Sequence, residues 1–219
     1  MGATLISDFW TLQRTARLLA RRRAKGNPVR RPAGASVGQQ RTLPCLLFFT
    51  DPVRTPAPEA LATRLPKGSA IVYRHFGAQD AEARARRLLA IARVRGLKLL
   101  IGRDVALAAR IGAHGVHLPE NLAHRALPVK VAHPGWLVTS AAHSLRAARA
   151  SRADAVVLSV TFPSRSASAG RAMGPIRLAL RVRASGQAAY ALGGVNNKTA
   201  RRLLDAGLIG LAAVDGFRT

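Results

Sequence analysis

Eight short apolar runs, each separated from the next by a longer segment of helical period, constrain the fold of this chain more than any other feature. Strands that are apolar along their whole length are typical of a parallel sheet covered by helices. The predicted strands are Cys45–Thr50, Ala70–Arg74, Lys98–Ile101, Gly115–Leu118, Trp136–Ser140, Ala155–Val160, Ala188–Leu192 and Ile209–Val214.

The count of eight strands favours closure into a barrel over an open doubly wound sheet. We therefore predict an α/β protein, a single (β/α)₈ TIM barrel. Too few residues follow Val214 for an eighth outer helix, so we expect the N-terminal helix, or a partner subunit as in a homodimer, to cover that gap. Predicted helices between the strands include Gln79–Arg95, Val105–Ile111, Ser144–Ser151, Ile176–Ala184 and Asn197–Ala206.

A basic amphipathic helix is predicted ahead of the barrel, from Asp8 to about Ala24. A stretch rich in Pro, Gly, Arg and Gln then indicates a linker from Lys25 to Thr42. We divide the chain into this N-terminal extension, residues 1–42, and a barrel domain, residues 43–219. The Arg-rich extension also resembles an organellar transit peptide, and docking on the barrel or a misassigned start codon are the other readings left open. Its apolar positions at helical spacing are Phe9, Leu12, Ala16 and Leu19.

The formal net charge of +25 is spread along the whole chain. A distributed positive field attracts nucleic acid, phosphorylated metabolites and anionic lipid alike. Arginine far outnumbers lysine beside abundant alanine, which is also the bias that a GC-rich genome gives to solvent-facing positions. Because there is no recognised nucleic-acid motif or aromatic-interleaved basic stripe, we expect small phosphorylated substrates and no specific nucleic acid. A general polyanion-binding role stays open.

Two further features indicate a cytoplasmic protein without a membrane segment. Charged residues or proline interrupt every apolar run before the roughly 18 residues that a membrane-spanning helix needs. Cys45 is the only cysteine, so the chain can form neither an internal disulfide nor a cysteine-based zinc site.

Barrels of this kind build their sites from the loops at the carboxyl ends of the strands, and phosphate commonly binds after strands 7 and 8. The strongest candidate is Gly193-Gly194, which follows the seventh strand and precedes a helix that begins with Asn. Glycines let an anion approach the backbone, and N–H groups of the first helical turn then hold it. The alternative is that the two glycines only make a tight turn.

The loop after the sixth strand, residues 161–171, combines hydroxyls, arginines and glycine with no acid. Such a loop suits phosphate, because arginine offers a bidentate fork and serine a short donor. A solvated loop without a ligand is the alternative.

Several titratable residues fall at the predicted barrel mouth. Arg74 closes an apolar strand, which is unfavourable unless the charge is paired or meets an anion, so we expect it at the mouth rather than in the helix layer. Histidines at strand ends can transfer protons near neutral pH, and they are His75, His117 and His143. The few carboxylates are Asp51, Asp104, Glu120 and Asp215, with no tight pair typical of a divalent metal site.

Five stretches, taken together and in order, resemble the family of thiamine phosphate synthase and its TenI-like relatives, over about Leu43 to Phe217. The resemblance implies a transferase that joins hydroxymethylpyrimidine pyrophosphate to thiazole phosphate, with Mg²⁺ holding the leaving pyrophosphate. A TenI-like thiazole tautomerase and a non-catalytic phosphate-ligand-binding barrel are the alternatives. The stretches are Leu47–Asp51, Gly112–Leu118, His143–Leu145, Val160–Ser164 and Leu192–Asn196.

The chain departs from the family at the metal and pyrophosphate positions. The family motif Gln-x-Arg-x-Lys of strand 2 aligns with Val72, Arg74 and Phe76, so only the arginine is kept. An Asn-Asp pair after strand 3 becomes Gly102-Arg103, with Asp104 displaced by one position. The Gly-Gln-x-Asp stretch after strand 4 becomes residues 119–122, which leaves one carboxylate.

The resemblance therefore implies an altered metal site beside a retained thiazole-phosphate site. Mg²⁺ would depend on Asp104 and Glu120 as candidate ligands. Arg74, Arg103 and His143 are the implied catalytic residues. The implied phosphate-binding residues are Ser164, Arg165, Ser166, Gly193, Gly194, Val214 and Asp215.

Overall fold

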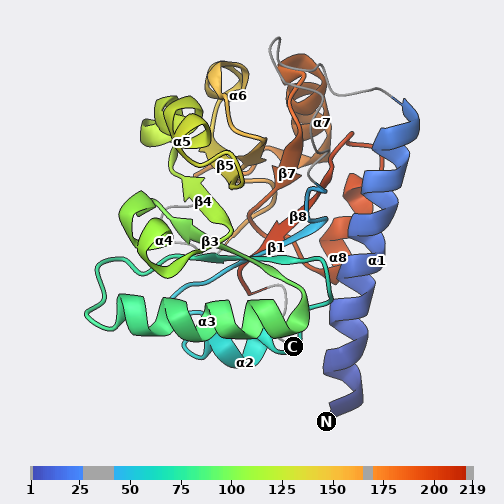
Figure 1. Ribbon diagram of the computed structural model, residues 1–219. Helices are drawn as coiled ribbons and strands as arrows, with labels where there is room; N and C mark the ends of the chain where they lie inside the picture. Colours follow the sequence, from blue (N-terminus) through green and yellow to red (C-terminus); the bar gives the residue numbers. More distant parts are fainter. Residues whose placement is uncertain (1, 27–41, 165–169, 216–219) are drawn as a thin grey trace.

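A computed structural model describes residues 2–26, 42–164 and 170–215. It confirms the predicted fold, because eight parallel strands pair in chain order and β8 pairs with β1 to close the barrel (Figure 1). The strands are β1 (Leu46–Phe49), β2 (Ala70–Tyr73), β3 (Lys98–Gly102), β4 (Gly115–Leu118), β5 (Leu137–Ala142), β6 (Ala155–Leu158), β7 (Ala189–Ala191) and β8 (Gly210–Ala213).

Helices form a layer outside the barrel (Figure 1). The predicted helix Asn197–Ala206 is shorter than expected, because it ends at Ala200 and continues as a 3₁₀ turn. The α-helices are α1 (Gly2–Gly26), α2 (Pro58–Ala62), α3 (Ala81–Arg95), α4 (Val105–Ile111), α5 (Ala126–Ala132), α6 (Leu145–Ala150), α7 (Gly174–Ser185) and α8 (Asn197–Ala200). The 3₁₀ helices are η1 (Glu120–Arg125) and η2 (Arg201–Leu203).

The side chains of the apolar strands pack into two hydrophobic cores, since successive side chains point to opposite faces of a strand. Phe49 and Val72 belong to the cluster inside the barrel, and Phe48 and Ile71 to the cluster between barrel and helices. Tyr190 fills the interior, where its hydroxyl donates to the Pro44 carbonyl at 2.6 Å. This packing explains why the runs are continuous rather than alternating in polarity.

Helix α1 lies alongside α8 and packs on it and on β8, where an eighth outer helix would otherwise be missing (Figure 1). Its apolar stripe is fully covered, with Leu12 and Ala16 at 0% and Leu19 at 1% exposure. Arg22 pairs with Asp205, and the Arg23 guanidinium donates to carbonyls of the barrel. Of the two expected ways to cover the gap, the N-terminal helix is the one found.

The proposed division at residue 42 stays a prediction, because residues 27–41 of the linker lie outside the described residues. Within the described ranges, no helix has both the length and the apolar character needed to cross a membrane.

Shortening a side chain of α1 that is buried against the barrel should destabilise the protein. Leu12→Ala is expected to lower the free energy of unfolding by about 2–5 kcal/mol, since it leaves a cavity in a fully buried site. Leu18→Ala is the matched control on the same helix, because Leu18 is 41% exposed, and its cost should stay within about 0.5 kcal/mol. Urea unfolding measures both. Equal small losses in the two variants would contradict the docking of α1.

Candidate active site at the carboxyl end of the barrel

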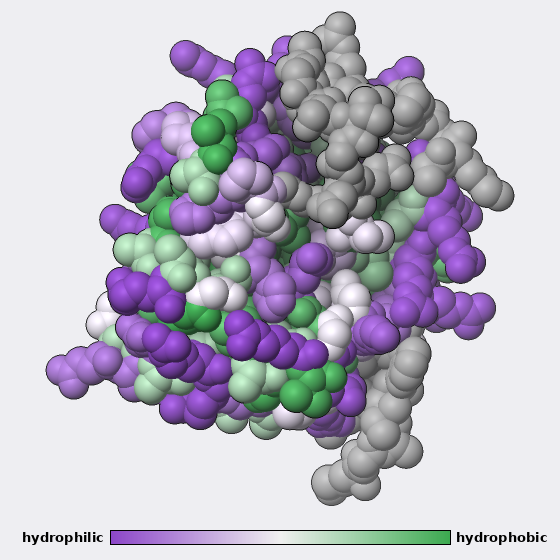
Figure 2. Space-filling model, viewed as in Figure 1, coloured by the Kyte–Doolittle hydropathy of each residue, from purple (hydrophilic) through white to green (hydrophobic). Residues whose placement is uncertain are grey.

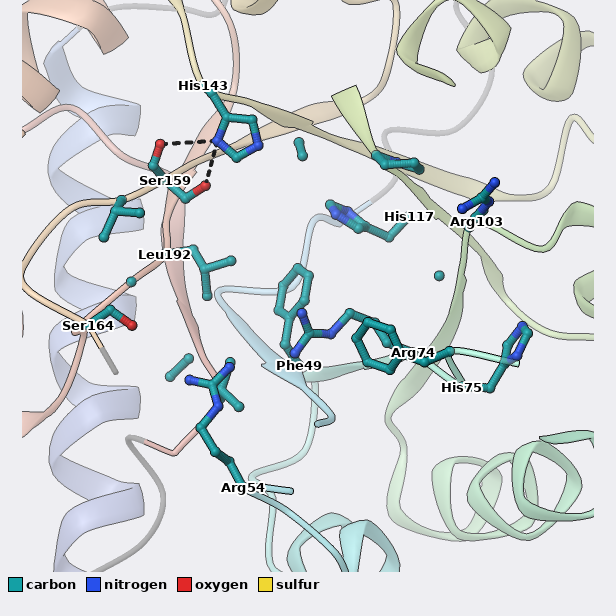
Figure 3. A pocket seen from close by; sticks show the side chains of 18 of the residues that line it. Phe49, Arg54, Arg74, His75, Arg103, His117, His143, Ser159, Ser164 and Leu192 are labelled. Carbon is teal, nitrogen blue, oxygen red and sulfur yellow. Dashed lines mark hydrogen bonds between the residues drawn. The ribbon is translucent and has the colours of Figure 1, made fainter. Parts of the chain in front are cut away.

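A cavity of about 980 Å³ lies at the mouth of the barrel, lined by residues at and after the carboxyl ends of the strands (Figure 3). Glu120 is not among the lining residues, and Arg165 and Ser166 lie outside the described residues. The sequence-predicted residues that line the cavity are Arg74, Arg103, Asp104, His143, Ser164, Gly193, Gly194, Val214 and Asp215.

Arg74 projects from the end of β2 into this cavity, as expected (Figure 3). Its Nε donates to the Thr50 carbonyl at 2.8 Å, and its Nη2 lies 3.4 Å from Asp51 Oδ2. The guanidinium carbon is 5.6 Å from the ring centre of Phe49 and 5.2 Å from that of Phe76. Burial lowers the pKa of Arg74 to about 10, while Asp51 acts in the opposite direction. The side chain is therefore a fixed and charged group near neutral pH.

Asp51 and Arg54 form a support for Arg74. Asp51 Oδ1 accepts from the backbone N–H of Arg54 at 2.9 Å, and Oδ2 lies 3.0 Å from the Arg54 guanidinium. Burial alone would raise the pKa of Asp51, but the hydrogen bonds and charge of Arg54, with the charge of Arg74, hold it below its usual value. Arg54 itself lines the cavity, and sequence reasoning missed it. The signal was an arginine three residues after an aspartate in a mouth loop.

His117 lies deep in the cavity wall. Its Nδ1 is 2.9 Å from Thr139 Oγ1, and its ring meets the ring of Phe49 edge to face at 4.9 Å. Burial, and secondarily the charge of Arg74, lowers the pKa of His117 to about 3. The imidazole is therefore neutral at pH 7 and can exchange hydrogen bonds without adding charge. All three expected mouth histidines, including His75, line the cavity.

Lowering the pH should reduce the free energy of unfolding, because His117 stays neutral in the folded protein. The histidine pKa is about 6.5 in an unfolded chain, so between about pH 6.5 and pH 3 the unfolded state binds a proton that the folded state does not. We expect His117 to contribute a fall in the free energy of unfolding of up to about 1.4 kcal/mol per pH unit over this window. The measurement is denaturant unfolding between pH 4 and 7. His117→Gln should flatten the pH dependence, whereas replacement of the exposed His124 by Gln should not. Equal slopes in the parent and His117→Gln would overturn the expectation.

His143 is held at the mouth from several sides. Its Nδ1 lies 3.1 Å from the Ser159 hydroxyl and 3.4 Å from the Ser159 carbonyl (Figure 3). Its own carbonyl accepts from Arg181 at 2.8 Å, and its backbone N–H donates to Glu120 Oε2. The ring is thereby placed in the cavity with one nitrogen already engaged.

Both candidate Mg²⁺ ligands, Asp104 and Glu120, are engaged by other groups. Asp104 caps helix α4, where its Oδ1 accepts from the Leu107 N–H at 2.8 Å. Its other oxygen lies 3.6 Å from His75 Nε2, and Glu120 is engaged by the backbone of His143. Mg²⁺ is usually held by one or two carboxylates together with substrate phosphates and water. Among the residues that the structure describes, no group of three or more His, Cys, Asp or Glu side chains could hold a metal ion.

The turn after β7 requires its two glycines. Gly193 has φ +94° and Gly194 has φ +62°, a region that other residues rarely adopt. A Cβ atom at Gly194 would lie 2.4 Å from the Pro163 carbonyl, and one at Gly193 would lie 2.8 Å from a methyl group of Val160. The backbone N–H groups of Gly193, Gly194 and Val195 donate to no other described residue. This glycine turn, residues 193–195, can therefore offer donors to an anion.

Asn196 is the N-cap of α8, as expected. Its side chain accepts from the N–H groups of Lys198 and Thr199, and Thr199 completes a capping box. Two N–H groups of the first turn are thus already used. An anion here would bind mainly to the glycine turn rather than to the helix.

The charges around the cavity favour an anionic ligand. Its described lining contains four arginines, Arg54, Arg74, Arg103 and Arg125, and two carboxylates, Asp104 and Asp215. Arg125 was also missed by sequence reasoning, because it comes from η1, which follows β4 and was not predicted. Leu192, which directly precedes the glycine turn, lies across the mouth from Arg103 (Figure 3), so a ligand can carry negative charge at two ends.

The chain is similar to known proteins in sequence and in fold. The family model described as thiamine monophosphate synthase matches residues 46–217. A thiamine-phosphate synthase of Chromobacterium violaceum is 31% identical over 145 residues, which are 63% of this chain and 70% of that protein.

Two solved structures share the barrel fold. The thiamine phosphate pyrophosphorylase from Pyrococcus furiosus has a TM-score of 0.64 at 23% identity, covering 80% of this chain and 88% of its own. A HpcH/HpaI aldolase/citrate lyase family protein from Burkholderia cenocepacia has a TM-score of 0.57 at 14% identity, covering 80% and 89%. At these identities both show likeness of fold alone.

Proposed function

Because this chain belongs to the thiamine monophosphate synthase family, we propose that it is a cytoplasmic enzyme that joins hydroxymethylpyrimidine pyrophosphate to thiazole phosphate. The products are thiamine phosphate and pyrophosphate. The family and the C. violaceum relative support a thiamine phosphate synthase-like role in thiamine biosynthesis. The observation that carries the finer proposal is that one cavity is lined both by the glycine turn, with its backbone N–H donors, and by four arginines.

The glycine turn would hold the phosphate of the thiazole. Gly193 and Gly194 offer backbone donors, and Ser164 lines the same side of the cavity (Figure 3). Neutral donors that are fixed in place bind phosphate without having to reorganise. Arg165, Ser166, Val214 and Asp215 stay part of this proposed phosphate site.

The arginines would stabilise the pyrophosphate as it departs. Negative charge grows on this group while its bond to the pyrimidine methylene breaks, and a fixed guanidinium meets that charge without moving. Arg74 is fixed by the Thr50 carbonyl and Asp51, and Arg103 lines the same cavity. Asp104 and Glu120 are both engaged elsewhere, which supports a reaction that depends on arginine rather than on bound Mg²⁺.

A TenI-like thiazole tautomerase is the second candidate. The observation that favours it is His143, whose ring is held by Ser159 within the cavity that also contains the glycine turn. Such a histidine could move a proton on a thiazole phosphate. This activity would need no pyrimidine substrate.

Product formation by the purified full chain tests the proposal. The protein is mixed with both substrates, once with magnesium and once with a chelator. Thiamine phosphate in both mixtures is the expected result, and product only with magnesium would show that the interpretation of the carboxylates is wrong. No product in either, with thermal stabilisation by thiazole phosphate alone, would overturn the synthase and leave the tautomerase or a binding protein.

A further inference from the structure

A row of arginines follows the outer side of α1, outside the cavity. Arg14, Arg17 and Arg21 are exposed and recur at helical spacing, so they share one face of the helix. We call these three residues the α1 arginine stripe. The opposite side of the helix is buried on the barrel, and Arg22 and Arg23 anchor it there. Figure 2 shows hydrophilic side chains along this part of the molecule.

The stripe differs from the arginines around α3, which lie close to acids. Around α3, Arg86 and Arg110 lie 2.7 and 3.3 Å from Glu82, and Arg87 lies 3.2 Å from Glu59. Within the described residues, by contrast, neither Arg14 nor Arg21 forms an ion pair. Arg17 lies beside the Cys45 thiol.

Positive charge on this side extends beyond the stripe. The exposed Lys198 and Arg201 belong to α8 and η2, next to α1, and Asp205 there is already paired with Arg22. Positive charge therefore continues from the stripe onto the neighbouring surface of α8 and η2.

We propose that the α1 arginine stripe binds the phosphate backbone of double-stranded nucleic acid without reading its sequence. The arginines recur about once per helical turn, or about every 5 Å, along a rigid helix. A duplex presents about one negative charge per 1.7 Å of its axis, and arginine suits phosphate as a bidentate donor. The stripe lies apart from the cavity, so this role is independent of the proposed reaction.

Two other polyanions fit the stripe less well. Single strands are held largely by stacking on aromatic side chains, and the exposed residues among the described side chains of α1 include no aromatic ring. An interfacial membrane helix inserts its apolar face into lipid, whereas Leu12, Ala16 and Leu19 are buried on the barrel.

Fluorescence anisotropy with a labelled duplex of arbitrary sequence tests this proposal at several salt concentrations. The affinity of the parent should fall steeply with salt. In the variant Arg14→Gln/Arg17→Gln/Arg21→Gln, the slope of log K against log salt should become shallower by about 0.9 for each lost contact. The control Arg86→Gln/Arg87→Gln/Arg110→Gln removes the same net charge from paired positions and should keep most of the parent slope.

Three outcomes would overturn the proposal. They are equal losses in the two triple variants, tighter binding of single strands than of duplex, and binding of phosphatidylglycerol vesicles in place of duplex. If circular dichroism shows that the stripe variant is misfolded, Arg14→Gln/Arg21→Gln gives the same test without touching the neighbour of Cys45. Product formation should be unchanged in the stripe variant, which separates this proposal from the proposed reaction.

Discussion

Arg74→Ala is expected to reduce thiamine phosphate formation by at least about 100-fold. The side chain is held in the cavity by the Thr50 carbonyl, Asp51 and two aromatic rings, so its charge is already in place when the pyrophosphate departs. Removing one fixed group that stabilises charge in a transition state costs about 10²–10³ in kcat. The measurement is the steady-state rate of product formation with both substrates.

Two further variants sharpen the test of Arg74. Arg74→Lys keeps a charge but loses the donor to the Thr50 carbonyl, so its rate should fall between those of the parent and Arg74→Ala. Arg110→Ala removes a surface arginine paired with Glu82 and should leave the rate unchanged. A raised KM at unchanged kcat in Arg74→Ala would mean that Arg74 only binds substrate and does not stabilise the departing group.

Gly194→Ala should both destabilise the protein and abolish its stabilisation by thiazole phosphate. The new methyl group would lie 2.4 Å from the Pro163 carbonyl and 2.8 Å from Phe162 Cβ, so the loop after β6 must move. We expect a loss of more than about 3 kcal/mol, which combines backbone strain with this clash. Denaturant unfolding and thermal shift with thiazole phosphate measure the two effects.

Gly186→Ala is the matched control for that substitution. Gly186 has nearly the same backbone angle, φ +66°, but a Cβ atom there would meet nothing within 4 Å. It should therefore lose only the strain of about 1–2 kcal/mol and keep the response to thiazole phosphate. Equal losses of unfolding free energy in the two variants would show that the close approach of Gly194 to Pro163 does not contribute to the effect of the substitution.

The barrel could be predicted because its strands are short and apolar throughout, and the strand positions differ from those predicted only at their ends. Helices α2 and α5 were not predicted, since each contains a proline, Pro58 or Pro128, that is typical of a loop. Pro58 is the first residue of its helix, where the missing N–H has no partner in any case. Local composition could not separate this position from a break.

Site residues could be predicted where they come after the end of a strand. They could not be predicted where their role depends on a contact with another residue of the site. Arg74 follows β2 directly and Gly194 lies shortly after β7, and both line the cavity at the mouth of the barrel. Glu120 could not be placed from sequence, because its carboxylate meets the backbone of His143, 23 residues away. Arg54 was missed for a related reason, since its importance comes from sharing Asp51 with Arg74.

The docking of α1 has a consequence for synthesis. Arg22 and its partner Asp205 are 183 residues apart, and strand β1 closes the barrel by pairing with β8. On a ribosome, α1 and β1 therefore emerge long before the surfaces that they need. The apolar stripe of α1 then stays uncovered while most of the chain is made, so the nascent protein is most prone to aggregate, and most in need of a chaperone, just before its final strand appears.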